Sequence, residues 1–240
     1  MKRITIIGTG YVGLVSGAGI SEFGHHVTCC DIDRDKIKEL KSGHIPIYER
    51  GLESLVKQNV TKGRLYFSWD VHKAIQDSEI IFIAVGTPQG NDGESDLGAV
   101  ESVTKTIGEN LNGYKIICTK STVPVGTGKW IEDIIRTIQP KADFDYVSNP
   151  EFLREGAAIK DFMHPDRVVI GTRTSKALDV MREVYRALYI NETPILSTSV
   201  ETAEMIKYAS NAFLALKISY INEIANLCEE VGADVHEITR

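Results

Sequence analysis

The sequence is poor in cysteine, and its cysteines are not grouped. There are four, Cys29, Cys30, Cys118 and Cys228, with no C-x-x-C pair and no Cys/His cluster. A zinc site or a disulfide framework needs such groupings, so we expect neither. The prediction is a reduced, cytoplasmic protein that holds no metal.

Long apolar runs and excess positive charge are missing too. No stretch of about 18 uninterrupted apolar residues occurs, so no membrane-spanning helix is predicted. The first residues, MKRITIIGTG, lack the apolar segment and the cleavage site of a signal peptide. The net charge of −6 argues against general binding of nucleic acid, because no basic surplus exists to neutralise phosphates. An anionic ligand would need helix N-termini or a few well-placed cations.

What the chain does contain is a series of short apolar runs that alternate with helix-like segments. The runs are RITIIG, HHVTCCD, SEIIFIAVG, YKIICTKS, FDYVSNP and DRVVIG. Buried helix is an alternative for such runs, but their length and their Val/Ile content favour strand. Strands of this kind, separated by helices, are typical of a parallel sheet covered on both faces. We therefore predict an α/β fold: a Rossmann-type, doubly wound, mostly parallel sheet followed by a long C-terminal helix.

Two segments depart from this alternation. The polar stretch 87–96, TPQGNDGESD, is predicted to be a mobile loop that covers a site. From Val200 to Gly232 there is no proline and apolar residues recur every three or four positions, which predicts one long amphipathic helix that ends at Gly232. The recurring residues are Met205, Ala209, Phe213, Leu216, Tyr220, Ile224 and Leu227. We expect one domain over residues 1–199 and, over 200–240, a helix that connects to another domain or subunit; a bent helix packed on its own domain is the alternative.

The segment GTGYVG (8–13) matches the pattern G-x-G-x-x-G and lies between the first apolar run and a helix-like segment. In that context Gly8 allows a tight turn, Gly10 lets a pyrophosphate approach the backbone, and Gly13 permits close packing of helix on strand. The next run ends at Asp31, where a carboxylate would accept hydrogen bonds from the adenosine ribose and disfavour the extra phosphate of NADP. The pattern predicts an NAD site, and a purely structural glycine turn is the alternative.

Two pairs of polar residues are spaced four apart. Glu151 and Glu155, in NPEFLREG (149–156), would point to the same side of a helix. Like charges at that spacing destabilise a helix slightly, so the pair indicates a ligand; a solvated helix face that carries two acids is the alternative. Lys207 and Asn211 lie on the long helix, where a cation and an amide can together stabilise an oxyanion. Taken alone, such a pair is more often simply solvated.

Several motifs in sequence give the chain a specific resemblance. They are GTGYVG, VGTP (85–88), KSTVPVG (120–126), NPEFLREG and EMIKYASNAFLALKISYINEIA (204–225). With them the whole chain resembles the N-terminal part of the UDP-glucose 6-dehydrogenase family, and NPEFLREG is more like the UDP-glucose branch than the GDP-mannose or UDP-N-acetylmannosamine branches. The resemblance implies oxidation of the C6 alcohol of UDP-glucose to UDP-glucuronate, for polysaccharide or conjugation pathways, with two NAD molecules and a cysteine thioester.

The resemblance also assigns roles to individual residues. Glu151 matches an acid for proton transfer and thioester hydrolysis that also contacts the sugar, and Glu155 matches a residue near the nicotinamide of NAD. Lys207 and Asn211 match the pair that holds the substrate and stabilises oxyanions. Thr122 matches a hydroxyl beside the cofactor and the hydrolytic water, although an ST-turn before a proline is its alternative. The strip that lines the substrate is Phe152, Leu153 and Arg154; further cofactor contacts are Tyr11, Val12, Thr87 and Lys36, of which Lys36 is alternatively a solvated helix charge.

One departure from the family limits these expectations. The family's catalytic cysteine lies in a G-G-x-C-x-x-K-D segment that does not occur in these residues, and neither Cys118 nor Cys228 fits the nucleophile. We therefore expect the 240 residues to bind NAD, to form a homodimer through the long helix, and to complete no turnover with UDP-glucose. The alternatives that stay open are a GDP-mannose, UDP-N-acetylmannosamine or simple β-hydroxyacid dehydrogenase, and a non-catalytic NAD-binding or assembly module.

Overall fold

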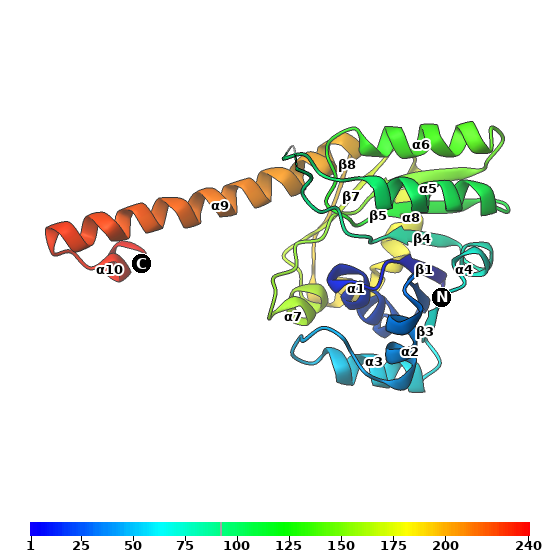
Figure 1. Cartoon of the computed structure of the whole chain (residues 1–240), viewed down its shortest axis with the longest axis horizontal. Coiled ribbons are helices and arrows are strands. Elements are labelled where there is room, and N and C mark those ends of the chain that lie inside the picture. The colour runs from blue at the N-terminus through cyan, green and yellow to red at the C-terminus, as the bar shows by residue number, and fades with distance from the viewer. Residues whose placement is uncertain (92) are drawn as a thin grey trace.

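An eight-stranded sheet in the order β3-β2-β1-β4-β5-β6-β7-β8 forms the centre of the computed structural model, which describes residues 1–91 and 93–240 (Figure 1). All neighbouring strands are parallel except β6 and β7, which pair antiparallel. The strands are β1 (Arg3–Ile7), β2 (His26–Cys30), β3 (Leu65–Ser68), β4 (Ile80–Ile83), β5 (Lys115–Thr119), β6 (Phe144–Ser148), β7 (Val168–Thr172) and β8 (Ile195–Thr198). The prediction of a doubly wound, mostly parallel sheet is confirmed.

The six apolar runs correspond to β1, β2, β4, β5, β6 and β7. The sequence analysis missed the two edge strands, β3 and β8, each of four residues. An edge strand is paired on one side only, and both of these strands carry exposed residues, among them Tyr66 and Leu196. They therefore lack the continuous apolar run that marks a central parallel strand.

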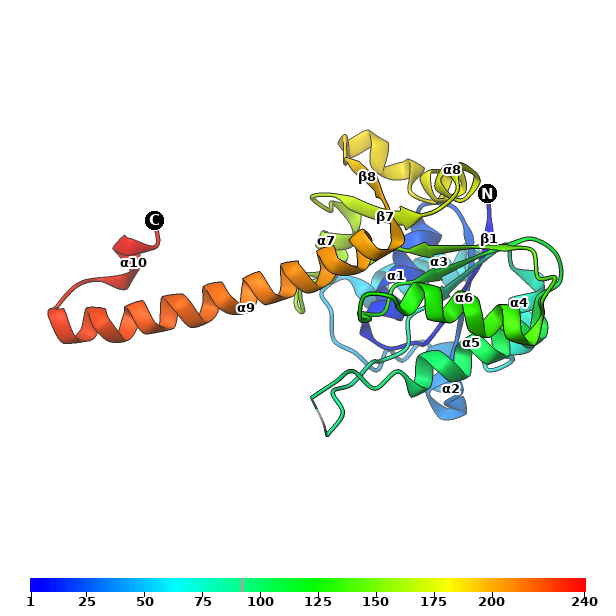
Figure 2. The same cartoon turned by 90° about the horizontal axis from the view of Figure 1, so that it is seen from above.

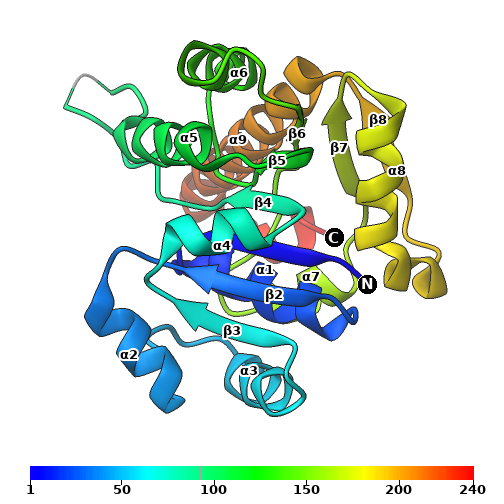
Figure 3. The same cartoon turned by 90° about the vertical axis from the view of Figure 1, so that its right-hand side faces the viewer.

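Helices cover both faces of the sheet (Figure 3). One face packs against α1 (Tyr11–Glu22), α2 (Arg34–Ser42), α3 (Leu52–Thr61), α7 (Ala158–Met163) and α8 (Ser175–Val184). The other packs against α4 (Val71–Asp77), α5 (Gly98–Asn110) and α6 (Thr127–Ile138). Successive strand residues serve opposite faces, as Phe82 packs in the first layer and Ile83 in the second. A 3₁₀ helix, η1 (Arg186–Asn191), follows α8.

Helix α9 (Val200–Val231) leaves the sheet and extends away from it as an arm, with α10 (Val235–Ile238) at its far end (Figures 1 and 2). It begins after Ser199, whose side chain accepts a hydrogen bond from the Thr202 amide, and ends at Gly232 in the left-handed conformation (φ 75°). At 1.5 Å per residue its 32 residues span about 48 Å. The predicted long helix and its glycine end are confirmed. In the part of the chain that the structure describes, no helix is both long and apolar enough to cross a bilayer.

Candidate active site

The glycine loop joins β1 to α1 beside the point where the strand order reverses, between β1 and β4. Gly8 has a left-handed backbone (φ 102°), and a Cβ there would lie 2.6 Å from the Ala84 carbonyl oxygen. A Cβ on Gly13 would lie 1.9 Å from the Gly8 carbonyl oxygen, so helix and turn are in backbone contact. Around Gly10 the space is open to 4 Å, and no described side chain caps this end of α1. The first-turn amides of α1 are therefore available to an anion.

Asp31 lies at the end of β2, next to this loop. The amide and hydroxyl of Thr9 donate hydrogen bonds to its Oδ2 (2.9 and 2.7 Å), and the Asp33 amide donates to its Oδ1 (3.1 Å). Lys36 places its Nζ 3.3 Å from the same Oδ2. Burial opposes ionisation, but these hydrogen bonds and the Lys36 charge outweigh it and hold the pKa of Asp31 below its usual value. Asp31 is thus a fixed, charged acceptor beside the glycine loop.

Two hydroxyl residues join the carboxyl ends of β4 and β5. The Thr87 hydroxyl donates to the Thr122 carbonyl oxygen (2.8 Å), and the Ser121 hydroxyl donates to the Val85 carbonyl oxygen (2.7 Å). The structure therefore brings Thr87 and Thr122 together at the edge of the sheet that holds the glycine loop. Residue 92 of the predicted covering loop lies outside the described residues; farther along that loop, the Ser95 hydroxyl lies 3.3 Å from the Tyr208 hydroxyl of α9.

The interpretation that Glu151 and Glu155 share one helix face is wrong. Residues 151–154 have no regular structure, and α7 begins only at Ala158. Backbone amides that would bond to carbonyl groups within a helix bond to side chains instead. The Glu151 carboxylate, for example, accepts a hydrogen bond from the Leu153 amide (2.5 Å). The buried carboxylate of Glu49 accepts from the amides of Gly156 and Ala158 (2.6 and 3.2 Å). These bonds hold the segment in an irregular path in front of α7.

Glu151 and Glu155 nevertheless both act electrostatically on one residue of the glycine loop. The Tyr11 hydroxyl is buried and interacts with the carboxylate of Glu49. Burial and then the carboxylates of Glu49, Glu155 and Glu151 raise the pKa of Tyr11 above its usual range. The negative charge of this segment therefore faces the start of α1, where the cofactor residues were predicted.

The central contact of the site joins Glu151 to Lys207 of α9. The Lys207 Nζ lies 2.8 Å from Glu151 Oε1, and the two side chains are only 8% and 12% exposed. The same Nζ lies 5.5 Å from the centre of the Phe152 ring. An ion pair shielded in this way from water is a stronger and more fixed charge arrangement than a surface pair.

A pocket of about 620 Å³ contains this pair. All six residues predicted for the substrate line it: Glu151, Phe152, Leu153, Arg154, Lys207 and Asn211. Arg154 itself is turned to Asp161, with its Nη2 2.7 Å from the carboxylate. A buried cation such as Lys207, beside an acid and an amide, can hold a polar ligand and stabilise negative charge that develops on its oxygen atoms.

Three functional candidates were missed by sequence reasoning: Glu49, Lys120 and Glu204. Lys120 lines the pocket, is 4% exposed, and donates one long hydrogen bond, to the Asn149 carbonyl oxygen (3.4 Å). Lys120 is the first residue of KSTVPVG, which contains Thr122. Glu204 is the first residue of the pattern E-x-x-K-Y-x-x-N, which contains Lys207 and Asn211, so both residues lie in motifs that the sequence analysis identified. Glu49 carried no signal, because its partners are more than a hundred positions away.

The cysteines are buried, and the described residues contain no cluster of metal-ligating side chains. All four cysteines are unpaired and buried. Burial raises the pKa of Cys30 to about 12 and also raises those of Cys29 and Cys118, which makes reactive thiolates unfavourable there. No group of three or more metal-ligating side chains occurs among residues 1–91 and 93–240.

Comparison with known proteins gives consistent results. Residues 2–189 match the model of the UDP-glucose/GDP-mannose dehydrogenase family, NAD binding domain, and residues 201–240 match the central domain of the same family. Two UDP-glucose 6-dehydrogenases, from Bacillus subtilis and Rhizobium meliloti, are each 56% identical over 99% of the chain, which covers 51% and 55% of their lengths. The chain thus spans about half the length of the curated relatives it matches.

Solved structures agree with this result. A UDP-glucose dehydrogenase from Pyrobaculum islandicum superposes with a TM-score of 0.95 at 37% identity, over 99% of this chain and 55% of that one. A GDP-mannose dehydrogenase from Pseudomonas aeruginosa, solved as a ternary complex, gives a TM-score of 0.94 at 40% identity, over 99% and 55% of the two chains. Both branches therefore share the fold described above.

Proposed function

The chain belongs to the UDP-glucose/GDP-mannose dehydrogenase family, and from this premise we propose that it is the NAD-binding half of a UDP-glucose 6-dehydrogenase. The enzyme would oxidise the C6 alcohol of UDP-glucose to UDP-glucuronate in two steps, for polysaccharide or conjugation pathways. The observation that carries the proposal is the buried Glu151–Lys207 pair in a pocket lined by all the predicted substrate residues.

The residues around the glycine loop fit NAD. Gly10 leaves open space in front of uncapped amides of α1, which suits a pyrophosphate. Asp31 is a charged acceptor for ribose hydroxyls and would repel the additional phosphate of NADP. This half of the site would be completed by Tyr11, Val12, Gly8, Gly13 and Lys36. The nicotinamide half would be formed by Thr87, Thr122 and Glu155. When bound, NAD supplies the hydride acceptor of the reaction.

The chain's own residues divide the remaining tasks. Lys207 and Asn211, one turn apart on α9, would stabilise negative charge on the oxygen at C6. Glu151, held by Lys207 and the Leu153 amide, would take part in proton transfer and in hydrolysis of the thioester. Phe152, Leu153 and Arg154 would position the sugar. The Thr122 hydroxyl would lie beside the cofactor and the attacking water.

We further propose that residues 1–199 form the NAD-binding domain and residues 200–240 the connecting helix and the start of a central domain. The apolar side chains along α9 would pair two copies of the chain as a homodimer. The four unpaired cysteines fit a reducing compartment, which we propose is the cytoplasm.

Titration of the 240-residue chain with NAD tests the first half of the proposal. We expect saturable binding that weakens at least about tenfold in Asp31→Asn, since the variant loses a charged acceptor for the ribose. Asp35→Asn, which removes an exposed acid that pairs with Lys38 on the same helix, is the matched control and should bind as the parent does. Equal loss in both variants, or no binding by the parent, would contradict the NAD site.

Assays with nucleotide sugars test the second half. The 240 residues alone should form no NADH with UDP-glucose, because the cysteine segment of the family is not among them. A complete chain that includes such a segment should be most active with UDP-glucose in a panel with GDP-mannose and UDP-N-acetylmannosamine. The likeness to the P. aeruginosa GDP-mannose dehydrogenase makes that sugar nucleotide the second candidate, and a preference for it would overturn the proposed substrate.

A further inference from the structure

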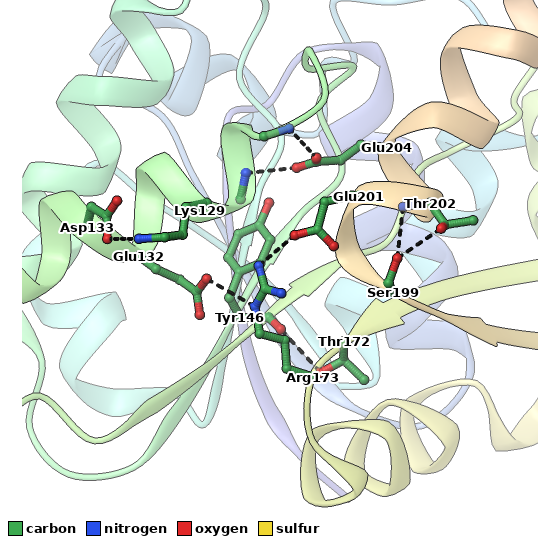
Figure 4. A network of polar contacts seen from close by, with 12 residues as sticks. Lys129, Glu132, Asp133, Tyr146, Thr172, Arg173, Ser199, Glu201, Thr202 and Glu204 are labelled. Atoms are coloured by element: carbon green, nitrogen blue, oxygen red, sulfur yellow. Dashed lines mark hydrogen bonds and ion pairs between the residues drawn. The ribbon is translucent and has the colours of Figure 1, made fainter.

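The start of α9 is fixed to the start of α6 by a buried carboxylate (Figure 4). Glu204 is 2% exposed, and its Oε2 accepts a hydrogen bond from the Gly126 amide (2.7 Å) while Oε1 accepts one from the Gly128 amide (2.8 Å). Gly126 is the N-cap of α6 and has no side chain to cap the helix. Glu204 therefore supplies from another element what a capping residue supplies locally.

A carboxylate suits this place in a way that the amide of glutamine does not. Both partners of Glu204 are N–H donors, and only an ionised carboxylate offers an acceptor to each. Its charge also lies at the positive end of the α6 dipole. Glutamine would turn its NH₂ group toward one of the two amides, which would leave that buried donor unsatisfied.

The packing around Glu204 leaves little freedom for α9 to shift. A Cβ on Gly128 would lie 2.5 Å from the Tyr146 ring and 2.6 Å from Val200. A Cβ on Gly171, in β7, would lie 2.5 Å from that of Ala203. The first turn of α9 is thus in close contact with both α6 and the sheet.

Glu204 connects two parts of the candidate site. Four residues before Gly126 in the chain stands Thr122, whose carbonyl oxygen accepts from Thr87. One turn after Glu204 on α9 stands Lys207, the partner of Glu151. The carboxylate therefore lies between the segment that carries Thr122 and the helix that carries Lys207 and Asn211.

We propose that Glu204 is a positioning residue that fixes α9 against the β5–α6 segment, so that Lys207 and Thr122 are held at a constant separation across the site. This inference rests on the proposed function for its effect on catalysis, but not for its effect on Lys207. Glu204 is not among the residues that line the pocket, so it would act through the two groups it aligns.

The neighbouring acid Glu201 offers a matched control on the same helix. It pairs with Arg173 (2.8 Å), which also lies 3.5 Å from Glu132 of α6 (Figure 4). The Arg173 and Glu201 side chains are 45% and 43% exposed, and surface pairs of this kind contribute little. Glu201→Gln removes one acid from the same turn of α9 without touching the α6 amides.

The test compares Glu204→Gln with Glu201→Gln and the parent. In the 240-residue chain, hydrogen exchange of the Gly126 and Gly128 amides and the rate of reductive methylation of Lys207 report the local structure. We expect at least tenfold faster exchange and faster methylation in Glu204→Gln only, with NAD affinity unchanged within about threefold.

The effect on catalysis is measured in a complete dehydrogenase that contains this chain. There, kcat of Glu204→Gln should fall at least tenfold, with KM for NAD and UDP-glucose nearly constant. Glu204→Asp keeps two acceptors and should recover part of the lost kcat.

Two results would overturn the inference. One is parental protection of Lys207 in Glu204→Gln. The other is a loss of kcat in Glu204→Gln that is fully explained by the unfolded fraction measured by circular dichroism. A similar loss of kcat in Glu201→Gln would count in the same way. If instead the parent enzyme oxidises no UDP-glucose while Lys207 is exposed only in Glu204→Gln, the proposed function fails and the positioning contact stands.

Discussion

Two buried lysines on and just after β5 differ in how their ammonium groups are satisfied. Lys115, at the start of the strand, donates to the carbonyl oxygens of Gln76 (3.2 Å) and Ser78. Lys120, just past its end, has only the 3.4 Å bond to the Asn149 carbonyl and lies 5.9 Å from the ring centres of Phe82 and Tyr185. Burial lowers the pKa of both lysines. The ammonium group of Lys115 is thus satisfied by backbone carbonyl groups, whereas that of Lys120 lines the pocket and has N–H donors that could bind a ligand.

Replacement of each lysine by methionine should therefore have opposite effects on stability. Lys120→Met removes a poorly paired buried charge and should raise the free energy of unfolding by about 1 kcal/mol. Lys115→Met leaves two carbonyl groups without a donor and should lower it by about 2 kcal/mol. Urea denaturation of both variants measures the difference. A destabilised Lys120→Met would show that this lysine supports the fold rather than the pocket.

At the scale of elements, the sequence predicts best where burial is complete. Central strands such as β1 and β4 are buried on both faces, and α9 carries its own periodic stripe and terminal glycine. In the segment 149–156 the i,i+4 spacing of two acids predicts a shared helix face, but the structure has no helix there before Ala158. The amides of this segment are instead taken by Glu151 and by Glu49, which lies far away in the chain. Tertiary hydrogen bonds of that range leave no local pattern.

His25 joins three elements at the amino-terminal ends of β1 and β2, which is the end of the sheet away from the candidate site. Its Nδ1 accepts from the Lys2 amide (3.1 Å), just before β1, and its Nε2 lies 3.2 Å from the carbonyl oxygen of Val184, the last residue of α8. The next residue, His26, begins β2. Both contacts together require a neutral ring with its proton on Nε2. Burial, the N-terminal ammonium and Lys2 lower the pKa of His25, although the Val184 carbonyl and Glu183 oppose them.

A lowered pKa makes stability depend on pH in a defined direction. The unfolded chain binds a proton at His25 below about pH 6.5, whereas the folded chain resists it, so stability falls as the pH drops through that value. We expect the parent to lose about 1 kcal/mol more than His25→Gln between pH 7.5 and 5.5. Urea midpoints of both proteins at the two pH values measure the difference. If the parent and His25→Gln lost the same free energy of unfolding between the two pH values, protonation of His25 would not destabilise the folded state.

At the scale of the molecule, the site is assembled from segments that the sequence cannot place together. The glycine loop, Glu151 and Lys207 come from α1, from the segment before α7 and from α9. Composition and spacing predict each segment's local structure, and the cofactor loop follows from its strand–turn–helix context. The Glu151–Lys207 pair joins residues 56 positions apart, so only the folded chain shows it.

Helix α9 presents two different faces outside the sheet. With about 100° between successive residues, Lys207 and Asn211 lie on one side, and Phe213, Leu216 and Tyr220 lie roughly half a turn away. These three apolar side chains are more than half exposed. An apolar seam on a projecting arm is the surface expected of a subunit interface.

The proposed dimer predicts how single charges on the arm change the assembly. Leu216→Glu places a carboxylate in the middle of the seam and should convert a dimer of the 26.6 kDa chain into monomers at micromolar concentration. Asn222→Glu adds the same charge to the other side of the helix and should leave the dimer intact. Sedimentation velocity distinguishes the species, and circular dichroism confirms that each variant keeps its helix. Because Leu216 is exposed in the single chain, loss of the dimer without loss of folding would assign the seam to a second copy. A parent that sediments as a monomer at every concentration, or a Leu216→Glu dimer, would refute that assignment.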